Sequence, residues 1–151
     1  MSSGSAHTTI NRPASEVWAA IADVTRMGDW SPECIAGRWV DGATGPAVGA
    51  KFEGDNVAKL AGRTIKKWTT TSHVTACEPG VVFEFNAEEY TTWRYEFVVA
   101  GENSTTVTES FDYTAKGFMG FVYDRVLVRP KAMTKGMNDT LARVKSTLEQ
   151  G

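Results

Sequence analysis

Hydrophobic and polar positions alternate with a period of two through the middle of this chain. The clearest case is the run in which Trp93, Tyr95 and Phe97 are separated by polar neighbours. Alternate side chains of a strand point to opposite faces, so this run predicts a strand over residues 91–100 with one face of aromatic rings. The same pattern, bounded by turn residues, predicts further strands over residues 7–11, 37–41, 50–55, 64–77, 80–87 and 104–114.

Two other regions follow a helical period instead. Apolar residues at i, i+4 and i+7 after Pro13 predict a short helix, and residues 25–30 predict a second short helical turn. Towards the end of the chain, apolar residues recur every three or four positions. Pro130 predicts a kink or break there, between a leading segment (118–128) and a main helix (130–148).

The links between the predicted strands are short and rich in turn residues. Glycine and proline concentrate at residues 42–49, and tight turns are predicted at 78–80 and 101–104. Residues 56–63 are expected to form another link. Links of this kind join antiparallel neighbours, so the order of elements predicts an α+β protein with a meandering sheet.

Length and composition fit a small soluble protein. The 151 residues include 16 basic and 18 acidic side chains, and no run of like charges is longer than a pair, so nucleic acid is not an expected partner. No apolar stretch approaches the roughly 20 residues that span a bilayer, and the first residues lack the parts of a signal peptide. We therefore expect a cytoplasmic protein without a transmembrane segment, with residues 1–5 as a disordered tail and residues 6–151 as a single domain.

Motifs that carry chemistry are sparse. Cys34 and Cys77 are far apart and share no metal-ligand spacing with His7 or His73, so we expect partly buried, reduced thiols and neither a metal site nor a cofactor. The chain has no nucleophile elbow, phosphate loop or Ser/His/Asp order. No catalytic motif is identifiable, and the sequence leaves open whether the protein is an enzyme.

Several segments together resemble a known superfamily. Residues 10–18, which read Ile-Asn-Arg-Pro-Ala-Ser-Glu-Val-Trp, and the later Trp30 resemble the opening of the START-like, or helix-grip, superfamily (SRPBCC). Residues 71–80 and 106–110 resemble its middle and late strands, and the branch is that of polyketide cyclases/dehydrases and lipid transport. The resemblance implies a curved antiparallel sheet wrapped around a long C-terminal helix, with two short helices after the first strand. It also implies a ligand cavity, but it singles out no activity.

The inward faces of these elements define a candidate pocket. A mostly apolar space of about 300–1,000 Å³ with a few polar groups would lie between sheet and helix. Two methionines on the helix would adapt to varied ligand shapes. The alternative is that the rings are ordinary core, since burying each one stabilises the fold by roughly 1.5–3 kcal/mol. The candidate ligand-binding residues are Trp39, Phe52, Trp68, Thr70, Ser72, Phe85, Trp93, Tyr95, Glu109, Phe111, Met133 and Met137.

Glu109 is the exception in its strand, because alternation places it on an apolar face. Burial would raise its pKa and suit it to proton transfer. The alternatives are a bulge that turns it outward, or an ion pair with Arg94 or Arg63. Tyr95 and Tyr113 are the other candidate catalytic residues, since each can donate a hydrogen bond to a ligand oxygen.

Three hypotheses for function remain. The first is binding or transport of a hydrophobic small molecule such as a lipid, isoprenoid or polyketide. The second is a polyketide cyclase, aromatase or dehydratase that uses the same cavity. The third is an interaction module that contacts a protein or membrane surface, with the protein partner unknown. It would use either the exterior of the sheet or the leading helix segment near Phe118, Met119 and Phe121.

Overall fold

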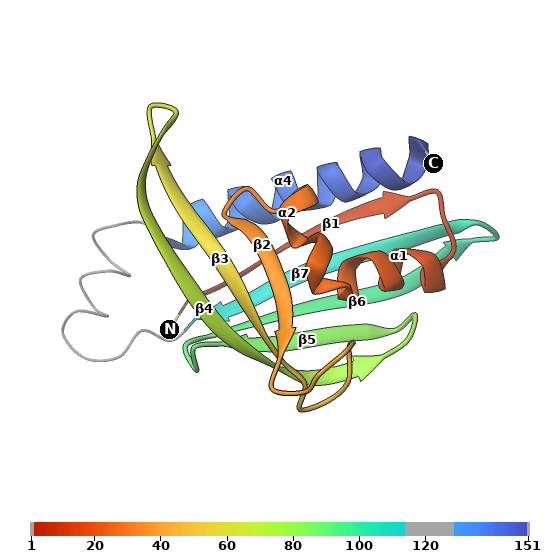
Figure 1. The fold of residues 1–151 in the computed structure, drawn as a ribbon. Helices are drawn as coiled ribbons and strands as arrows, with labels where there is room; N and C mark the ends of the chain where they lie inside the picture. Colours follow the sequence, from red (N-terminus) through yellow and green to blue (C-terminus); the bar gives the residue numbers. More distant parts are fainter. Residues whose placement is uncertain (1, 114–128, 151) are drawn as a thin grey trace.

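The computed structural model describes residues 2–113 and 129–150 (Figure 1). Its elements, in chain order, are β1 (Ser2–Ile10), α1 (Ala14–Ala22), the 3₁₀ helix η1 (Val24–Arg26), α2 (Met27–Trp30), β2 (Cys34–Val40), β3 (Lys51–Leu60), β4 (Arg63–Glu78), β5 (Val82–Ala87), β6 (Thr91–Gly101), β7 (Ser104–Tyr113) and α4 (Arg129–Gln150). This order confirms the predicted α+β class and the helix-grip fold, in which a curved sheet accompanies a C-terminal helix.

The strands form a seven-stranded antiparallel sheet in the order β1-β7-β6-β5-β4-β3-β2. From β2 to β7 each strand pairs with the next one along the chain, which confirms the predicted meander. The register shifts within several pairs, for example between Val74 and Ala76 of β4. Such irregularities bend a strand, and β4 accordingly runs through the curved part of the sheet (Figure 1).

The first strand is longer than the sequence indicated. Residues 2–5 pair with β7, with Gly4 opposite Phe111, so the expectation of a disordered tail over residues 1–5 is wrong for these residues. Small polar residues give no hydrophobic period from which a strand could be recognised. A Cβ atom on Gly4 would lie 2.8 Å from Cε1 of Phe111, so the absent side chain leaves room for that ring.

The expected link over residues 56–63 is also mostly strand. β3 continues to Leu60 and β4 begins at Arg63, which leaves a two-residue turn. Its residues, Ala61 and Gly62, have φ angles of 52° and 80°, as the turns that match the twist of paired strands require. The two strands therefore form a long hairpin that extends beyond the rest of the sheet (Figure 1).

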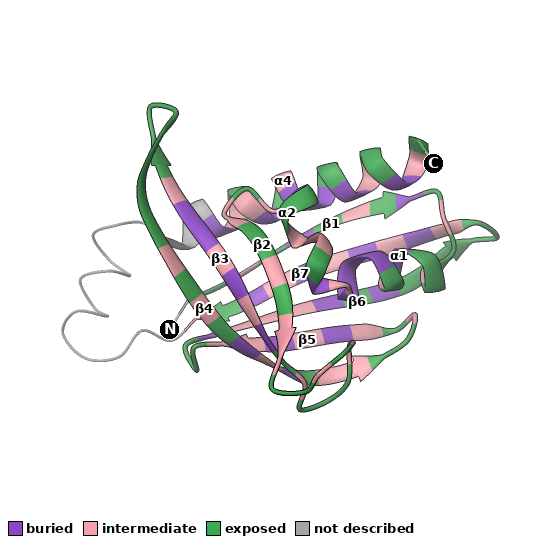
Figure 2. Ribbon diagram, viewed as in Figure 1, coloured by how far each residue is buried: buried purple, intermediate pink, exposed green. Residues whose placement is uncertain are grey.

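Helix α4 packs chiefly on β1, with smaller contacts to β7 and α2. Its buried residues lie on the side that faces the sheet (Figure 2), and they are Met133, Met137, Thr140, Leu141, Val144 and Leu148. The predicted main helix is thus confirmed, whereas the predicted leading segment (118–128), with Phe118, Met119 and Phe121, lies outside the described residues. In the described part of the chain, no helix combines the length and apolar composition needed to cross a membrane.

Candidate functional site

The centre of the candidate site is a row of residues across the inner face of the sheet. Glu109 of β7 lies between Ala6 of β1 and Tyr95 of β6. The pairing of β6 with β7 is regular around it, so no bulge turns Glu109 outward. The side chain is buried, with 3% of its surface exposed.

The ion-pair alternatives for Glu109 are also wrong. Arg94 points to the other face of the sheet, where Nη1 lies 2.8 Å from Oε2 of Glu84 and Nε lies 3.3 Å from Oε1 of Glu96. Arg63 lies at the end of the β3–β4 hairpin, opposite Leu60. Glu109 is therefore an inward-facing carboxyl group without a cationic partner among the described residues.

Tyr95 provides the hydrogen-bond partner of Glu109. Its hydroxyl group donates to Oε2 of Glu109 over 2.7 Å, whereas the buried Oε1 atom has no partner among the described residues. Burial away from water raises the pKa of Glu109 to about 8, and the hydrogen bond from Tyr95 lowers it by a smaller amount. The pKa of Tyr95 is raised well above its ordinary value, first by burial and then by the charge of Glu109.

This geometry fixes what the pair can do near neutral pH. Glu109 holds its proton, and because Oε2 accepts from Tyr95, the proton belongs on Oε1. Oε1 then offers an O–H donor to any acceptor that enters the interior. When Glu109 ionises, the same atom becomes an acceptor and a base.

Aromatic rings line the inner face on both sides of this pair. Phe52 contacts Trp39 and Phe85 edge-on, with ring centroids 5.7 and 5.0 Å apart. On the neighbouring strands, the centroids of Trp93 and Phe111 are 5.6 Å apart. The rings therefore form a continuous apolar wall from β2 to β7, and the polar Glu109–Tyr95 pair lies within it.

The predicted ligand-binding residues divide into two groups by exposure. The buried group consists of Phe52, Ser72, Phe85, Tyr95, Glu109, Phe111, Met133 and Met137. The half-buried group consists of Trp39, Trp68, Thr70 and Trp93. Because α4 packs chiefly on β1, the half-buried residues lie on strands with which that helix makes few contacts. They leave apolar surface on the inner face partly open.

Two inward-facing polar residues, Asn56 and Cys34, are not among the site residues predicted from the sequence. Asn56, 8% exposed, donates from Nδ2 to Oγ1 of Thr70 over 3.1 Å, and it pairs with Trp68 in the sheet. Cys34 pairs with Asn56, and its Sγ donates to the backbone oxygen of Ala36 over 3.3 Å. Both residues lie outside the strands predicted from the sequence. The alternation of Phe52 and Gly54, extended by two residues, would have predicted that Asn56 also faces inward.

Tyr113 does not join the Glu109–Tyr95 pair. It pairs with Thr91, four residues further along β7, which corresponds to roughly 13 Å at the rise of an extended strand. The candidate proton-transfer group therefore consists of Glu109 and Tyr95 alone among the three residues expected from the sequence.

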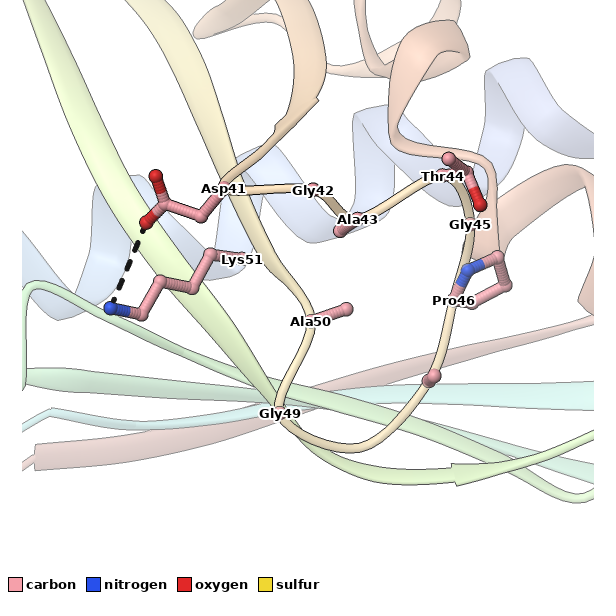
Figure 3. Close-up of a pocket in the computed structure, with 10 residues that line it drawn as sticks. Asp41, Gly42, Ala43, Thr44, Gly45, Pro46, Gly49, Ala50 and Lys51 are labelled. Carbon is pink, nitrogen blue, oxygen red and sulfur yellow. Dashed lines mark ion pairs between the residues drawn. The ribbon is translucent and has the colours of Figure 1, made fainter.

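A separate hollow lies on the surface at the connection between β2 and β3 (Figure 3). It has a volume of about 570 Å³ and is lined by residues 41–47 and 49–51, most of which are glycine, alanine or proline. Its charged groups are Asp41 and Lys51, and the Nζ atom of Lys51 lies 3.9 Å from Oδ2 of Asp41. This hollow contains no buried titratable group and lies on different elements from Glu109, so the candidate site is the one on the inner face.

The described residues contain no group of three or more histidine, cysteine, aspartate or glutamate side chains arranged to hold a metal ion. Cys34 and Cys77 are both half-buried free thiols. Burial raises the pKa of the Cys34 thiol, which favours its protonated form. The chemistry available on the inner face is therefore that of the Glu109–Tyr95 pair and neutral polar groups.

Comparisons with known proteins agree with the observed fold. The chain matches, over residues 1–149, the family described as polyketide cyclase/dehydrase and lipid transport. The solution structure of the Polyketide_cyc-like protein Cgl2372 from Corynebacterium glutamicum is 32% identical, with a TM-score of 0.66, and the match covers 97% of this chain and 91% of that chain. The fold is also shared with the di-domain ARO/CYC BexL from the BE-7585A biosynthetic pathway, at 15% identity and a TM-score of 0.70 over 99% of this chain and 47% of that one.

A curated relative is longer than this chain. The uncharacterized protein Rv0088 of Mycobacterium tuberculosis is 29% identical over 141 residues, which are 92% of this chain and 61% of that protein. The chain thus spans about three fifths of the length of the relative it matches.

Proposed function

Because this chain belongs to the polyketide cyclase/dehydrase and lipid transport family, we propose that it binds a hydrophobic small molecule on the inner face of its sheet. The observation that carries the proposal is Glu109, which is 3% exposed and has an unpartnered Oε1 atom. Native structures rarely leave a buried polar atom without a partner, so a ligand or an ordered water is expected at this atom. The half-buried Trp93, whose ring contacts Phe111, provides adjacent apolar contact surface.

The chemistry of the pair narrows the ligand class. A protonated Glu109 donates a hydrogen bond, so it favours a ligand with a carbonyl, ether or hydroxyl oxygen over a bare hydrocarbon. Lipids, isoprenoid alcohols and polyketides all combine apolar surface with such oxygens. Apolar contact supplies affinity, and the hydrogen bond to Glu109 fixes orientation.

A cyclase-, aromatase- or dehydratase-type enzyme is the second candidate. The observation in its favour is a buried carboxyl whose pKa is about 8, beside a phenol that retains its proton. A group that titrates near the working pH can both give and accept a proton. In this role Glu109 would transfer the proton and Tyr95 would orient the carboxyl group through their 2.7 Å hydrogen bond.

Native mass spectrometry of freshly purified protein tests for the ligand. We expect a non-covalent complex with a hydrophobic, oxygen-containing compound, released on unfolding. The released compound is then incubated with the protein and recovered. Recovery of the unchanged compound would show that the protein acts as a carrier. Recovery of a cyclised compound, or of one that has lost a water molecule, would show that the protein is an enzyme. A bare protein mass from several expression hosts would contradict the binding proposal.

Titration with Nile red, a neutral apolar dye that carries a carbonyl oxygen, tests the role of Glu109. Wild-type affinity should fall as the pH rises through about 8, because the ionised carboxylate repels the carbonyl oxygen. Glu109→Gln should keep its affinity, since the amide still donates. Glu84→Gln is the matched control, because Glu84 lies on the other face and pairs with Arg94. Equal pH profiles for wild type and Glu109→Gln would refute the role assigned to Glu109.

A further inference from the structure

The β3–β4 hairpin carries basic side chains and no acidic ones around its turn. From residue 56 to residue 77 the chain contains Lys59, Arg63, Lys66 and Lys67 but no aspartate or glutamate, although the whole chain has a net charge of −2. In the part of the chain that the structure describes, no ion pair joins these four side chains to a carboxylate. Among the described residues, their positive charge is therefore not balanced by an ion pair.

Two large apolar side chains accompany these cations. Leu60 is 67% exposed and Ile65 is 64% exposed, on either side of the two-residue turn at Ala61 and Gly62. Arg63 pairs with Leu60 across the hairpin, so a positively charged residue is adjacent to the exposed leucine. Further along β4, the Nζ atom of Lys66 lies 5.4 Å from the ring centre of Trp68.

The hairpin presents this tip away from the body of the protein. Figure 1 shows the turn between β3 and β4 projecting beyond the sheet and beyond α4. A projecting tip can approach a broad surface without interference from the rest of the molecule. Leu60 and Ile65 therefore lie where they can be buried by a partner.

We infer that the tip of the β3–β4 hairpin docks on an anionic lipid bilayer, with Leu60 and Ile65 inserted at the interface and the four cations at the level of the lipid headgroups. Charge complementarity argues for an anionic partner. Exposed aliphatic side chains at the tip argue for a lipid surface over nucleic acid or an acidic protein, because the headgroup boundary accepts aliphatic side chains and basic residues together. This inference stands on the hairpin and does not depend on the ligand proposed for the inner face.

Flotation of the full chain with vesicles tests the inference. We expect binding to vesicles of phosphatidylcholine mixed with phosphatidylglycerol, weak binding to phosphatidylcholine alone, and loss of binding as salt shortens the screening length from about 8 Å to about 3 Å. Lys66→Gln/Lys67→Gln should weaken partitioning about fivefold per charge, roughly 25-fold in total. Leu60→Ser/Ile65→Ser should weaken it at least about tenfold.

Matched variants at other surfaces serve as controls. Val98→Ser/Val99→Ser removes side chains that are 64% and 71% exposed, near the turn between β6 and β7, and it should bind as wild type does. Hydrogen exchange of the wild-type protein should show vesicle-dependent protection over residues 59–67, a readout that requires no variant.

Any one of three results with vesicles would overturn the inference: no preference for phosphatidylglycerol, unchanged binding by Leu60→Ser/Ile65→Ser, or no protection of residues 59–67. Equal affinity for polyglutamate or for duplex DNA would also overturn it. Such a result would show that the cations recognise a polyanion without a lipid surface.

Discussion

The raised pKa of Glu109 predicts an unusual dependence of stability on pH. Below the ordinary value of 4.5, the carboxyl group is protonated in both the folded and the unfolded chain. Between 4.5 and about 8 the unfolded chain releases the proton while the folded chain retains it. The stabilisation from Glu109 is thus fully present below pH 4.5 and is lost as the pH rises through about 8.

The magnitude follows from the width of this window. Each pH unit within it lowers the free energy of unfolding by about 1.4 kcal/mol, so the full window corresponds to on the order of 5 kcal/mol. That is a large fraction of the roughly 5–15 kcal/mol that stabilises an ordinary domain. Glu109→Gln removes the titration but keeps the size of the side chain and an oxygen that can accept from Tyr95.

We expect Glu109→Gln to gain stability relative to wild type as the pH rises. The difference in the free energy of unfolding, measured by urea denaturation, should grow by on the order of 4 kcal/mol between about pH 5 and about pH 8. Between about pH 5 and about pH 8, the free energy of unfolding of Glu84→Gln should change with pH in the same way as that of wild type. Burial raises the pKa of Glu84, but hydrogen bonds from Thr75 and Arg94 lower it by more, so its contribution is lost only on acidification. Parallel curves for wild type and Glu109→Gln would refute a protonated Glu109.

Two further substitutions test neighbouring features. Tyr95→Phe deletes the hydrogen bond that lowers the pKa of Glu109, so the fall in stability should extend to higher pH, with a loss of about 1–3 kcal/mol at pH 6 by urea denaturation; an unchanged profile would show that the pair is not formed. Gly4→Ala places a Cβ atom against the Phe111 ring and should lower the thermal midpoint by the equivalent of about 1–3 kcal/mol. A midpoint equal to that of wild type would mean that residues 2–5 do not pair with β7.

The period of two was sufficient to predict most strands and their inward faces. Glu109 and Tyr95 could both be assigned to inward faces because alternation depends only on each strand's own sequence. Their hydrogen bond could not be predicted, because it depends on the register between β6 and β7, which no single strand encodes.

The errors arose where side chains gave no periodic signal. Ser2–Ser5 are small and polar, so their pairing with β7 rests on backbone hydrogen bonds that composition does not reveal. Gly54 has no side chain and interrupts the apolar pattern of β3, so the inward position of Asn56 could not be recognised from that pattern. The half-buried state of Trp93 was also unpredictable, since it depends on which strands α4 covers.

The pairing of β1 with β7 also has a consequence for biosynthesis. Thr9 and Thr106, whose side chains are hydrogen-bonded, are 97 positions apart, so β1 is synthesised long before β7, the strand with which it pairs. At roughly 5–20 residues per second, β1 waits on the order of 5–20 s for β7 to be made. During translation the meander from β2 to β6 can assemble first, and the sheet is completed only when the last strand joins the first.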